Sequence, residues 1–493
     1  MRWLLLISYA CLLLHTRAAA QNDPACASPL PHPAVWDFIE QHRDAASGEN
    51  TFRLPVTLHI LRLNNGSSSF NSQIAIDALC AANARFQSAG ISFYLASPVR
   101  FINRSDLVNP PSFAAASAIL DEFNVFRTIN IYYTNLANFG TCAFAFFPGI
   151  GPGTPQNQGG VVMGTNCATD DGALLAHELG HFFNLPHTFD ETSINPRDWL
   201  FAERVTRNNN ETAPRLSANC NNAGDRFCDT PADFLPVRWN CPNTIAQTDT
   251  NGDQFQPDPT LYMGYARDSC MQRFSPQQIA VMRATLANTN APRGYLLLSP
   301  LPTGPSTVQS PQQLVPGSVD SQISIGQPLF RWSRVPGANW YHFRLFQFTS
   351  QQLIDTVIAD TVLSPPLGLL RPNRPYRWQV RALGTDALCG LPSPFFNFTA
   401  VASSMVPNEI PDIRVFPQPA TDHLYVSASW SQETVQLQLF DLQGRQLATT
   451  WHNDAREQGT LRWQIPQLAA GMYVLELRQG TRRSRHKLLL QHP

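Results

Sequence analysis

The stretch 171–186 repeats apolar residues at helical spacing. Its apolar positions fall on one face, where they can pack into a core: Leu174, Leu175, Leu179 and Phe182. Asp171 is a candidate N-cap, because its side-chain oxygen can accept from a free amide of the first turn. Asn184 and Pro186 mark the end of the helix. The pattern therefore predicts one amphipathic helix between these signals.

A second helix begins at a recognisable start signal. Ser275 is the expected N-cap, Pro276 occupies the first helical position, and Gln278 completes a capping box. Phe274 and Ile279 are spaced to form a hydrophobic staple. The first predicted strand spans 54–61. Further along, short strands with alternating polarity are predicted at 329–332, 341–345 and 376–380.

The predicted helix 171–182 carries the sequence His177-Glu178-Leu179-Gly180-His181, and His187 follows six residues later. Residues four apart share a helix face, so His177 and His181 can bind one cation. Three neutral imidazoles leave the fourth zinc position to water and lower its pKa from about 15.7 to roughly 7. Glu178 is placed to act as the general base. A purely structural zinc site would normally have a fourth protein ligand.

Three separated blocks resemble the pappalysin family of metzincins, in its ulilysin-like or cytophagalysin branch. They are HELGHFFNLPHTF (177–189), GDRFCDTPAD (224–233) and YMGYARDSCMQRFSPQQ (262–278). The resemblance spans roughly residues 50 to 290. It implies an α+β zinc endopeptidase with a mixed sheet, an active-site helix and an irregular lower subdomain. Metzincins usually have Gly where this chain has Asn184, and Asn is the next-best residue for positive φ.

The resemblance also implies roles for three residues near the second helix. Met263 matches the methionine of the Met-turn beneath the zinc. Tyr265 matches a tyrosine that supports the oxyanion, although a packed turn tyrosine is the alternative. Asp268 matches an aspartate at the base of the specificity pocket, which selects Arg or Lys just after the scissile bond. An exposed loop aspartate is the alternative for Asp268.

A structural calcium ion is also expected, in addition to the zinc ion. Asp249, Asn251 and Asp253 offer side-chain oxygens at alternate positions, which suits a hard cation. The segment Asp229-Thr230 borders a calcium site in the proteins that the chain resembles. A turn rich in Asp, Asn and Gly also forms without any metal.

Nine cysteines remain after the expected signal cleavage, so at least one should be unpaired. The resemblance implies that Cys241 pairs with Cys270. Proximity in the chain favours two further disulfides, Cys220–Cys228 and Cys142–Cys167. Cys80 lies on the apolar face formed by Ile76, Leu79 and Phe86, so we expect a buried free thiol there.

Cys26 precedes the first predicted strand. Cys26-Ala-Ser stands where related precursors often have Cys-Gly-Thr, the cysteine switch whose thiolate occupies the open position of zinc. The resemblance therefore makes Cys26 a candidate for enforcing latency, within a short pro-segment at 21–50.

The chain of 493 residues is long enough for several domains. Arg2 and the apolar run 3–14, followed by Ala18-Ala19-Ala20, predict a signal peptide at 1–20, and no other segment has the length of a membrane span. The net charge of −1 gives no reason to expect nucleic-acid binding. We expect a monomer that acts on protein or peptide substrates.

Composition divides the remainder of the chain. A Pro-, Gly- and Ser-rich linker is expected at 291–316, after the protease domain at 51–290. Residues 317–402 resemble a fibronectin type III-like β-sandwich, whose aromatic residues are expected in its core. The blocks VFPQPA (415–420), LFDLQGR (439–445) and LAAGMYV (468–474) resemble the C-terminal sorting domain of type IX secretion, here 408–493. The implied partner is the type IX machinery, with release or attachment at the cell surface.

The leading hypothesis is thus a secreted zinc endopeptidase with Glu178 as its base. The alternative is a surface-anchored adhesin or binding protein with an inactive or structural metal site. A binding protein has no need of Glu178, so the intact set of ligands and base favours the enzyme.

Overall fold

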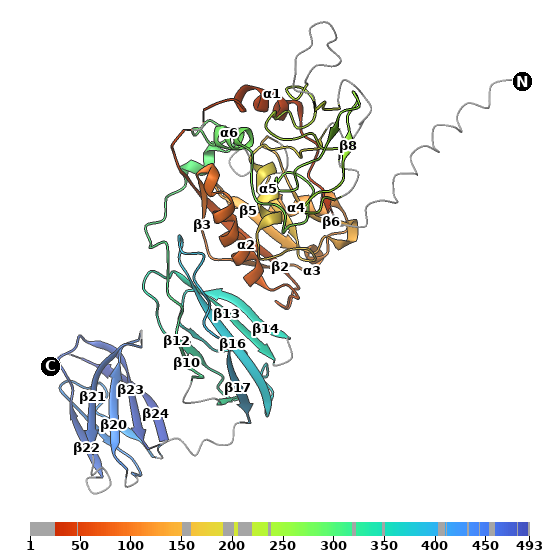
Figure 1. The fold of residues 1–493 in the computed structure, drawn as a ribbon. Coiled ribbons are helices and arrows are strands. Elements are labelled where there is room, and N and C mark those ends of the chain that lie inside the picture. Colours follow the sequence, from red (N-terminus) through yellow and green to blue (C-terminus); the bar gives the residue numbers. More distant parts are fainter. Residues whose placement is uncertain are drawn as a thin grey trace, which may run out of the picture. The chain divides into compact units, whose positions relative to one another are not determined.

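The computed structural model describes residues 25–46, 48–149, 159–190, 202–205, 219–234, 238–317, 322–347, 351–402, 410, 412–430, 433–442, 444–452, 459–480 and 482–491. The chain divides into two compact units (Figure 1). Unit 1 comprises Met1–Ile323, Pro328–Leu369 and Arg374–Thr399, and unit 2 comprises Ser324–Gln327, Leu370–Asn373 and Ala400–Pro493. The expected signal peptide lies outside the described residues. None of the described helices combines the length and the apolar character of a membrane span.

A seven-stranded mixed sheet organises the first part of unit 1. Its strands follow the order β1-β6-β7-β5-β2-β3, and β4 also pairs with β2. Only the β6–β7 pair is antiparallel among the described pairs of this sheet. The strands are β1 (Ala25–Cys26), β2 (Phe52–Arg62), β3 (Ile91–Leu95), β4 (Arg100–Asn103), β5 (Ile129–Thr134), β6 (Thr141–Ala145) and β7 (Val161–Gly164). The central strand β2 is buried along nearly its whole length, although polar residues such as Thr57 and His59 alternate with its apolar ones.

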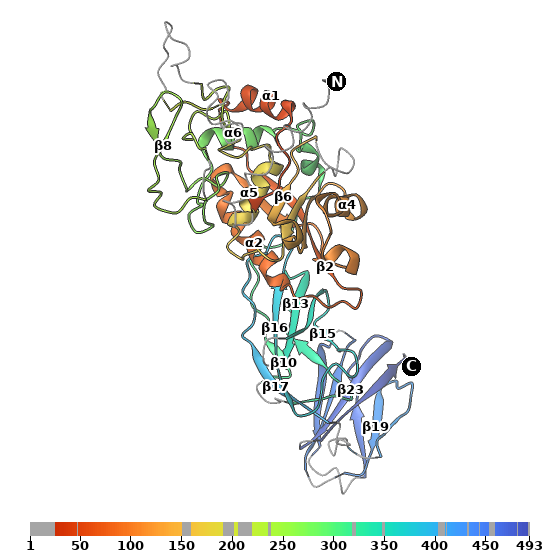
Figure 2. The same ribbon diagram turned by 90° about the vertical axis from the view of Figure 1, so that its right-hand side faces the viewer.

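Helices cover both faces of this sheet. On one face, α2 (Ser72–Arg85) and α5 (Ala173–Phe182) share a core with alternate strand residues such as Ile131 (Figure 2). On the other face, α4 (Phe113–Phe123) packs on the opposite set, including Tyr132. The shorter elements are α1 (Pro33–His42), α3 (Ser105–Val108), η1 (Gln87–Ala89) and η2 (Ala137–Phe139). The α+β prediction for this domain is confirmed.

The predicted active-site helix is α5, but it starts one residue later than an Asp171 N-cap would require. Gly172 is the N-cap residue and adopts a left-handed φ of 72°. A Cβ there would lie 2.7 Å from the carbonyl oxygen of Ala78, so α2 and α5 approach too closely for a side chain. Asp171 still accepts a hydrogen bond from the amide of Ala173 at 2.8 Å.

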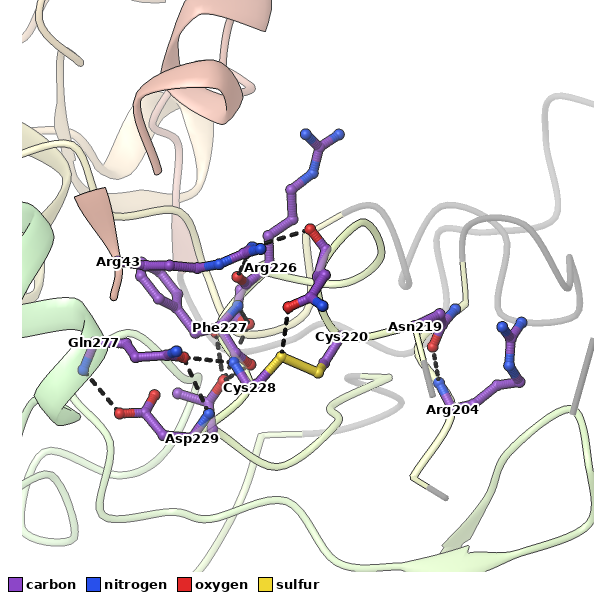
Figure 3. The surroundings of a disulfide bond; sticks show 12 residues. Arg43, Arg204, Asn219, Cys220, Arg226, Phe227, Cys228, Asp229 and Gln277 are labelled. Atoms are coloured by element: carbon purple, nitrogen blue, oxygen red, sulfur yellow. Dashed lines mark hydrogen bonds between the residues drawn. A yellow bond between two sulfur atoms is a disulfide. The ribbon is translucent and has the colours of Figure 1, made fainter. Parts of the chain in front are cut away.

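After α5 the chain becomes irregular. Within the described residues, the segment from 184 to 275 has only the short strands β8 (Gln247–Thr248) and β9 (Gln254–Phe255). Two disulfides cross-link it, Cys220–Cys228 and Cys241–Cys270. Figure 3 shows the first of these, beside which Arg43 donates to the carbonyl oxygens of Asn221 and Arg226. The segment before β2 is thereby attached to the lower part of the domain.

The second predicted helix is α6 (Pro276–Ala284). Its capping box is present, because Ser275 Oγ accepts from the amide of Gln278 and Gln278 Oε1 accepts from the amide of Ser275. The linker expected at 291–316 stays a prediction, and this segment includes some regular structure. It contains η4 (Gly294–Leu298), which contributes Tyr295 and Leu296 to the protease core, and β10 (Gln313–Val315).

Two sheets form the middle of the chain. The three-stranded sheet has the order β10-β12-β15 and the five-stranded sheet has the order β11-β17-β16-β13-β14. Trp332 and Trp378 are buried in the core, as expected for its aromatic residues. The comparison with a fibronectin type III domain stays a prediction. The remaining strands are β11 (Gln322–Ser324), β12 (Phe330–Trp332), β13 (Trp340–Gln347), β14 (Gln352–Ile358), β15 (Val362–Leu363), β16 (Arg374–Leu383) and β17 (Phe396–Val401).

The expectation of a free thiol at Cys80 is wrong. Cys80 on α2 forms a disulfide with Cys389, which follows β16 and lies 309 residues later. Polar contacts accompany this cross-link. Asp355 on β14 accepts from the amide and the hydroxyl of Ser72 at 3.0 and 2.6 Å, at the first turn of α2. The five-stranded sheet is therefore bonded covalently and by buried hydrogen bonds to the helix that supports α5.

Unit 2 is all β, as predicted. Its two antiparallel sheets have the orders β18-β19-β22 and β21-β20-β23-β24 and enclose an apolar core. Burial alone would raise the pKa of Glu476, but Arg483, Arg478 and Arg485 lower it to about 2. The strands are β18 (Arg414–Phe416), β19 (His423–Ser427), β20 (Val435–Phe440), β21 (Gln446–His452), β22 (Thr460–Gln464), β23 (Gly471–Gln479) and β24 (Arg482–Leu490).

Candidate metal centre and active site

The three histidines converge on one point. His177 and His181 extend from the same face of α5, one turn apart. Asn184 follows the helix with a φ of 77°, the left-handed conformation that turns the chain back toward the helix. His187 then completes the group. Its Nε2 lies 3.1 Å from Nε2 of His181, which is 3.2 Å from Nε2 of His177.

The Nδ1 atoms, on the other side of each ring, determine the tautomers of His177 and His181. Nδ1 of His177 lies 2.6 Å from the carbonyl oxygen of Tyr262, and Nδ1 of His181 lies 2.7 Å from that of Leu185. A carbonyl oxygen only accepts, so both Nδ1 atoms carry the proton and both Nε2 atoms present lone pairs. Burial first, and then the neighbouring His187, lower the pKa of His177 to about 3.

Asp190 orients the third ring, and the sequence reasoning missed it. Its Oδ1 lies 3.2 Å from Nδ1 of His187, while its Oδ2 accepts from the amide of the same residue at 2.9 Å. A carboxylate three residues after a candidate ligand is the signal that was available in the sequence. Such a partner is common behind a metal-binding histidine, because it holds the ring and its tautomer.

The donor set fits zinc. Imidazole Nε2 atoms that approach one another at 3.1 and 3.2 Å can share one cation, and zinc takes such ligands. Sγ of Cys26 joins the group, and the four ligand atoms all lie within 4.8 Å of one another. This is the one group of three or more metal-binding side chains found among the described residues.

Residues 25–28 lie against the helix motif. Strand β1 pairs in parallel with β6, and Sγ of Cys26 lies 3.6 Å from Nε2 of His181. Ser28, a second residue that sequence reasoning missed, donates to Oε2 of Glu178 at 3.2 Å and accepts from the amide of Ala145 at 2.9 Å. Glu178 is fully buried, and burial raises its pKa to about 8.

Met263 and Tyr265 lie below the histidines. Met263 is fully buried, and a Cβ added to Gly180 of α5 would lie 2.3 Å from its Sδ. This close approach explains why the helix carries glycine at that position. The hydroxyl of Tyr265 donates to the carbonyl oxygen of Cys26 at 2.8 Å.

Asp268 lies a short distance along the same segment. Its Oδ1 accepts from Nη2 of Arg238 at 2.9 Å. Burial raises the pKa of Asp268, and the Arg238 charge opposes that rise. Sequence reasoning gave no role to Arg238.

The calcium candidates do not gather into one carboxylate group. Asp249 accepts from the amides of Asn251 and Asp253 at 2.8 and 2.9 Å, as a turn-forming aspartate does. Asp229 accepts from Ser275 Oγ and from the amide of Gln277, at the start of α6. Thr230 donates to Asp225. These contacts account for the residues without a cation, and a calcium site stays a prediction.

Two sequence families match this chain. Residues 116–287 match the peptidase family described as Pregnancy-associated plasma protein-A. Residues 414–491 match the family described as Secretion system C-terminal sorting domain. The first match contains the three histidines, Glu178, Met263, Tyr265 and Asp268.

Curated relatives are similar over about half of the chain. An extracellular metalloprotease of Arthroderma gypseum is 25% identical over 288 residues, which is 55% of this chain and 85% of the relative. An extracellular metalloprotease of Verticillium alfalfae is 27% identical over 293 residues, covering 55% of this chain and 93% of the relative. Among solved structures, mirolysin in complex with compound 9 is 20% identical with a TM-score of 0.37, covering 50% of this chain and 96% of mirolysin.

Proposed function

We propose that this chain, which carries a pappalysin-family metalloendopeptidase domain and a type IX secretion sorting domain, is made as a latent precursor of a secreted zinc endopeptidase. The sorting domain indicates delivery by type IX secretion to the cell surface or beyond it. The observation that carries the proposal is the convergence of the Nε2 atoms of the three histidines beside the buried Glu178.

The proposed zinc ligands are His177, His181 and His187. Zinc, when bound, supplies a Lewis acid that activates water and polarises the scissile carbonyl. Glu178 then accepts the proton of the attacking water and passes it to the leaving amine. Asp190 and the two backbone carbonyls hold the imidazole rings in the orientation that this requires.

Tyr265 is the proposed electrophilic partner. Its hydroxyl already donates to one peptide carbonyl beside the histidines, that of Cys26. After the segment with Cys26 leaves, the same hydroxyl can donate to the scissile carbonyl oxygen as negative charge develops on it. Asp268 is proposed to bind Arg or Lys just after the scissile bond, because a carboxylate pairs with a guanidinium or an ammonium group.

Cys26 is the proposed cause of latency. Burial, and then the charge of Glu178, raise the pKa of its thiol, so a thiolate there needs an adjacent cation. Strand β1 also occupies the edge of β6, where an extended peptide could otherwise pair. Ser28 holds Glu178, the proposed base. The segment therefore covers the proposed metal position, the sheet edge and the base together.

The domain division follows from this proposal. Residues 1–20 would be removed during export and 21–50 during activation, leaving 51–290 for catalysis. The middle region at 317–402 and the tail at 408–493 would then serve structure and secretion.

Metal removal and restoration tests the proposed function. The processed protein is incubated with a chelator and assayed on a library of unstructured peptides, before and after one equivalent of zinc is added. We expect cleavage to stop and then to return with zinc. An untreated, zinc-loaded protein that cleaves no peptide would contradict the proposal and favour a binding protein.

The latency proposal has its own test. A Cys26→Ser precursor should cleave the library faster than the wild-type precursor, because a hydroxyl is a much weaker zinc ligand than a thiolate. Equal activity of the two precursors would contradict the role given to Cys26.

A further inference from the structure

The proposed specificity carboxylate already has a partner within the chain. Nη2 of Arg238 donates to Oδ1 of Asp268 at 2.9 Å, and Nε of the same guanidinium donates to the carbonyl oxygen of Ala266 at 2.8 Å. The two side chains remain 35% and 24% exposed, so the pair is accessible to a substrate. Arg238 is thus held by two bonds in a position that neutralises Asp268.

The backbone fixes Arg238 beside the proposed active site. The amide of Trp239 donates to the carbonyl oxygen of Tyr265 at 2.8 Å, and the amide of Arg267 donates to the carbonyl oxygen of Trp239 at 3.1 Å. Trp239 is fully buried and donates through Nε1 to Asp233, which anchors this segment.

We propose that Arg238 is a specificity-determining residue, whose guanidinium competes with a basic substrate side chain for Asp268. This inference rests on the proposed function, in which Asp268 lies at the base of the specificity pocket. While Arg238 stays bound, Oδ2 of Asp268 accepts no hydrogen bond from the described residues, so one oxygen remains for a substrate. An incoming guanidinium can then form one bond instead of two, and it meets the like charge of Arg238.

The competition has two consequences for cleavage. The preference for a basic residue over a neutral one is weaker than an unpaired aspartate would give. The preference for Arg over Lys is also weak, because the two-point pairing that favours a planar guanidinium is blocked. Removal of Arg238 should strengthen both preferences. A general change in pocket charge would act on Arg and Lys alike, so a rise in the preference for Arg over Lys indicates that Arg238 had blocked two-point pairing with Asp268.

The test measures kcat/KM of the processed protein on three peptides that differ only in the residue after the scissile bond, Arg, Lys or Leu. Arg238→Ala and the similarly sized, neutral Arg238→Gln should raise the Arg-to-Leu ratio about fivefold, the size expected for one half-exposed ion pair. The Arg-to-Lys ratio should rise as well. Asp268→Ala should remove the basic preference, and adding Arg238→Ala to it should not restore that preference or raise the Arg-to-Lys ratio.

Arg104→Ala is the matched control, because Arg104 also pairs with an aspartate, Asp106, but on the exposed surface of another part of the domain. Its profile should equal that of the wild type, and thermal unfolding of every variant checks the fold. Unchanged ratios in both folded Arg238 variants, while Asp268→Ala loses the basic preference, would overturn the role of Arg238 alone. Retention of that preference in Asp268→Ala would overturn the pocket and this inference together, and a wild type that cleaves none of the peptides would overturn the proposed function.

Discussion

The two sides of the proposed active site are built in different ways. Above the histidines, the mixed sheet and the helices α2 and α5 form a regular framework whose backbone groups bond within the elements. Below them, the described part of the chain from 184 to 275 has two short strands, and its positions depend on disulfides and on side chains that bond to the backbone. The regular side presents two of the proposed ligands and the proposed base, whereas the irregular side presents the third proposed ligand, Tyr265 and Asp268.

The two sides therefore have different proposed roles. Helical spacing alone places His177, Glu178 and His181, so the chemistry depends on residues of the regular side. The irregular side can change its loops without disturbing that spacing, and it carries the groups proposed to contact the substrate. Each substitution below changes residues on one side or at the contact between the two sides.

The largest effect is expected for Glu178→Gln on the regular side. The amide cannot accept the proton of water, so turnover should fall by roughly 10³-fold, the typical contribution of a general base. Zinc content and thermal stability should stay near the wild type, because Glu178 is not a proposed ligand. Substantial cleavage by this variant, measured as kcat on one peptide, would remove Glu178 from the mechanism.

On the irregular side, replacing Cys241 and Cys270 together by Ser should lower the free energy of unfolding by about 3–4 kcal/mol. The bridge closes a loop of 29 residues, and its loss gives the unfolded chain more freedom. Hydrogen exchange followed by mass spectrometry should show the extra opening in 238–275 and little change in α2 and α5. Equal increases in hydrogen exchange on both sides would contradict the proposed difference between the regular and the irregular side.

The third ligand depends on a short side-chain contact rather than on a helix. Asp190→Ala leaves Nδ1 of His187 without its carboxylate, so zinc affinity should fall about 10- to 100-fold. Competition with a chelating dye measures the affinity directly. An unchanged dissociation constant would mean that the loop alone holds the ring.

Gly180 lies where α5 of the regular side contacts Met263 of the irregular side. Its substitution gives the smallest expected effect. Ala at this position gains up to about 1 kcal/mol of helix propensity, but its Cβ would overlap Sδ of the buried Met263. Overpacking costs about 1–3 kcal/mol, so we expect a net loss of about 1–2 kcal/mol in thermal unfolding. Gly304→Ala, where the nearest atom would lie 3.6 Å away, is the control and should show no such loss. A more stable Gly180→Ala protein would show that the two sides are loosely packed.

On the regular side the sequence predicted α5, the strand β2 and a mixed sheet, and on the irregular side it predicted only separate residues and disulfides. Helical periodicity located α5, and the need for a reversal after it correctly required positive φ at Asn184. The start of α5 was misplaced by one residue, because the reason for Gly172 is its contact with α2, which lies about 90 residues earlier. Local patterns therefore specify elements better than they specify contacts between them.

Apart from Asp190, the residues that sequence reasoning missed or misjudged depend on long-range contacts. Cys80 was expected to be free because its partner, Cys389, lies in another part of the chain that no local pattern connects to it. Arg238 and Asp268 are 30 residues apart and meet only because Trp239 and Tyr265 lie side by side. Ser28 has no significance until β1 pairs with β6 and brings it to Glu178.

X-ray absorption at the zinc edge of the secreted, unprocessed precursor tests the central claim most directly. The account predicts one zinc per chain, with three nitrogen neighbours at about 2.0–2.1 Å and one sulfur neighbour at about 2.3 Å. After removal of the segment with Cys26, the sulfur should be replaced by oxygen while the three nitrogens remain. A precursor without zinc, or with fewer than three nitrogen neighbours around it, would contradict the metal centre on which the proposed enzyme depends.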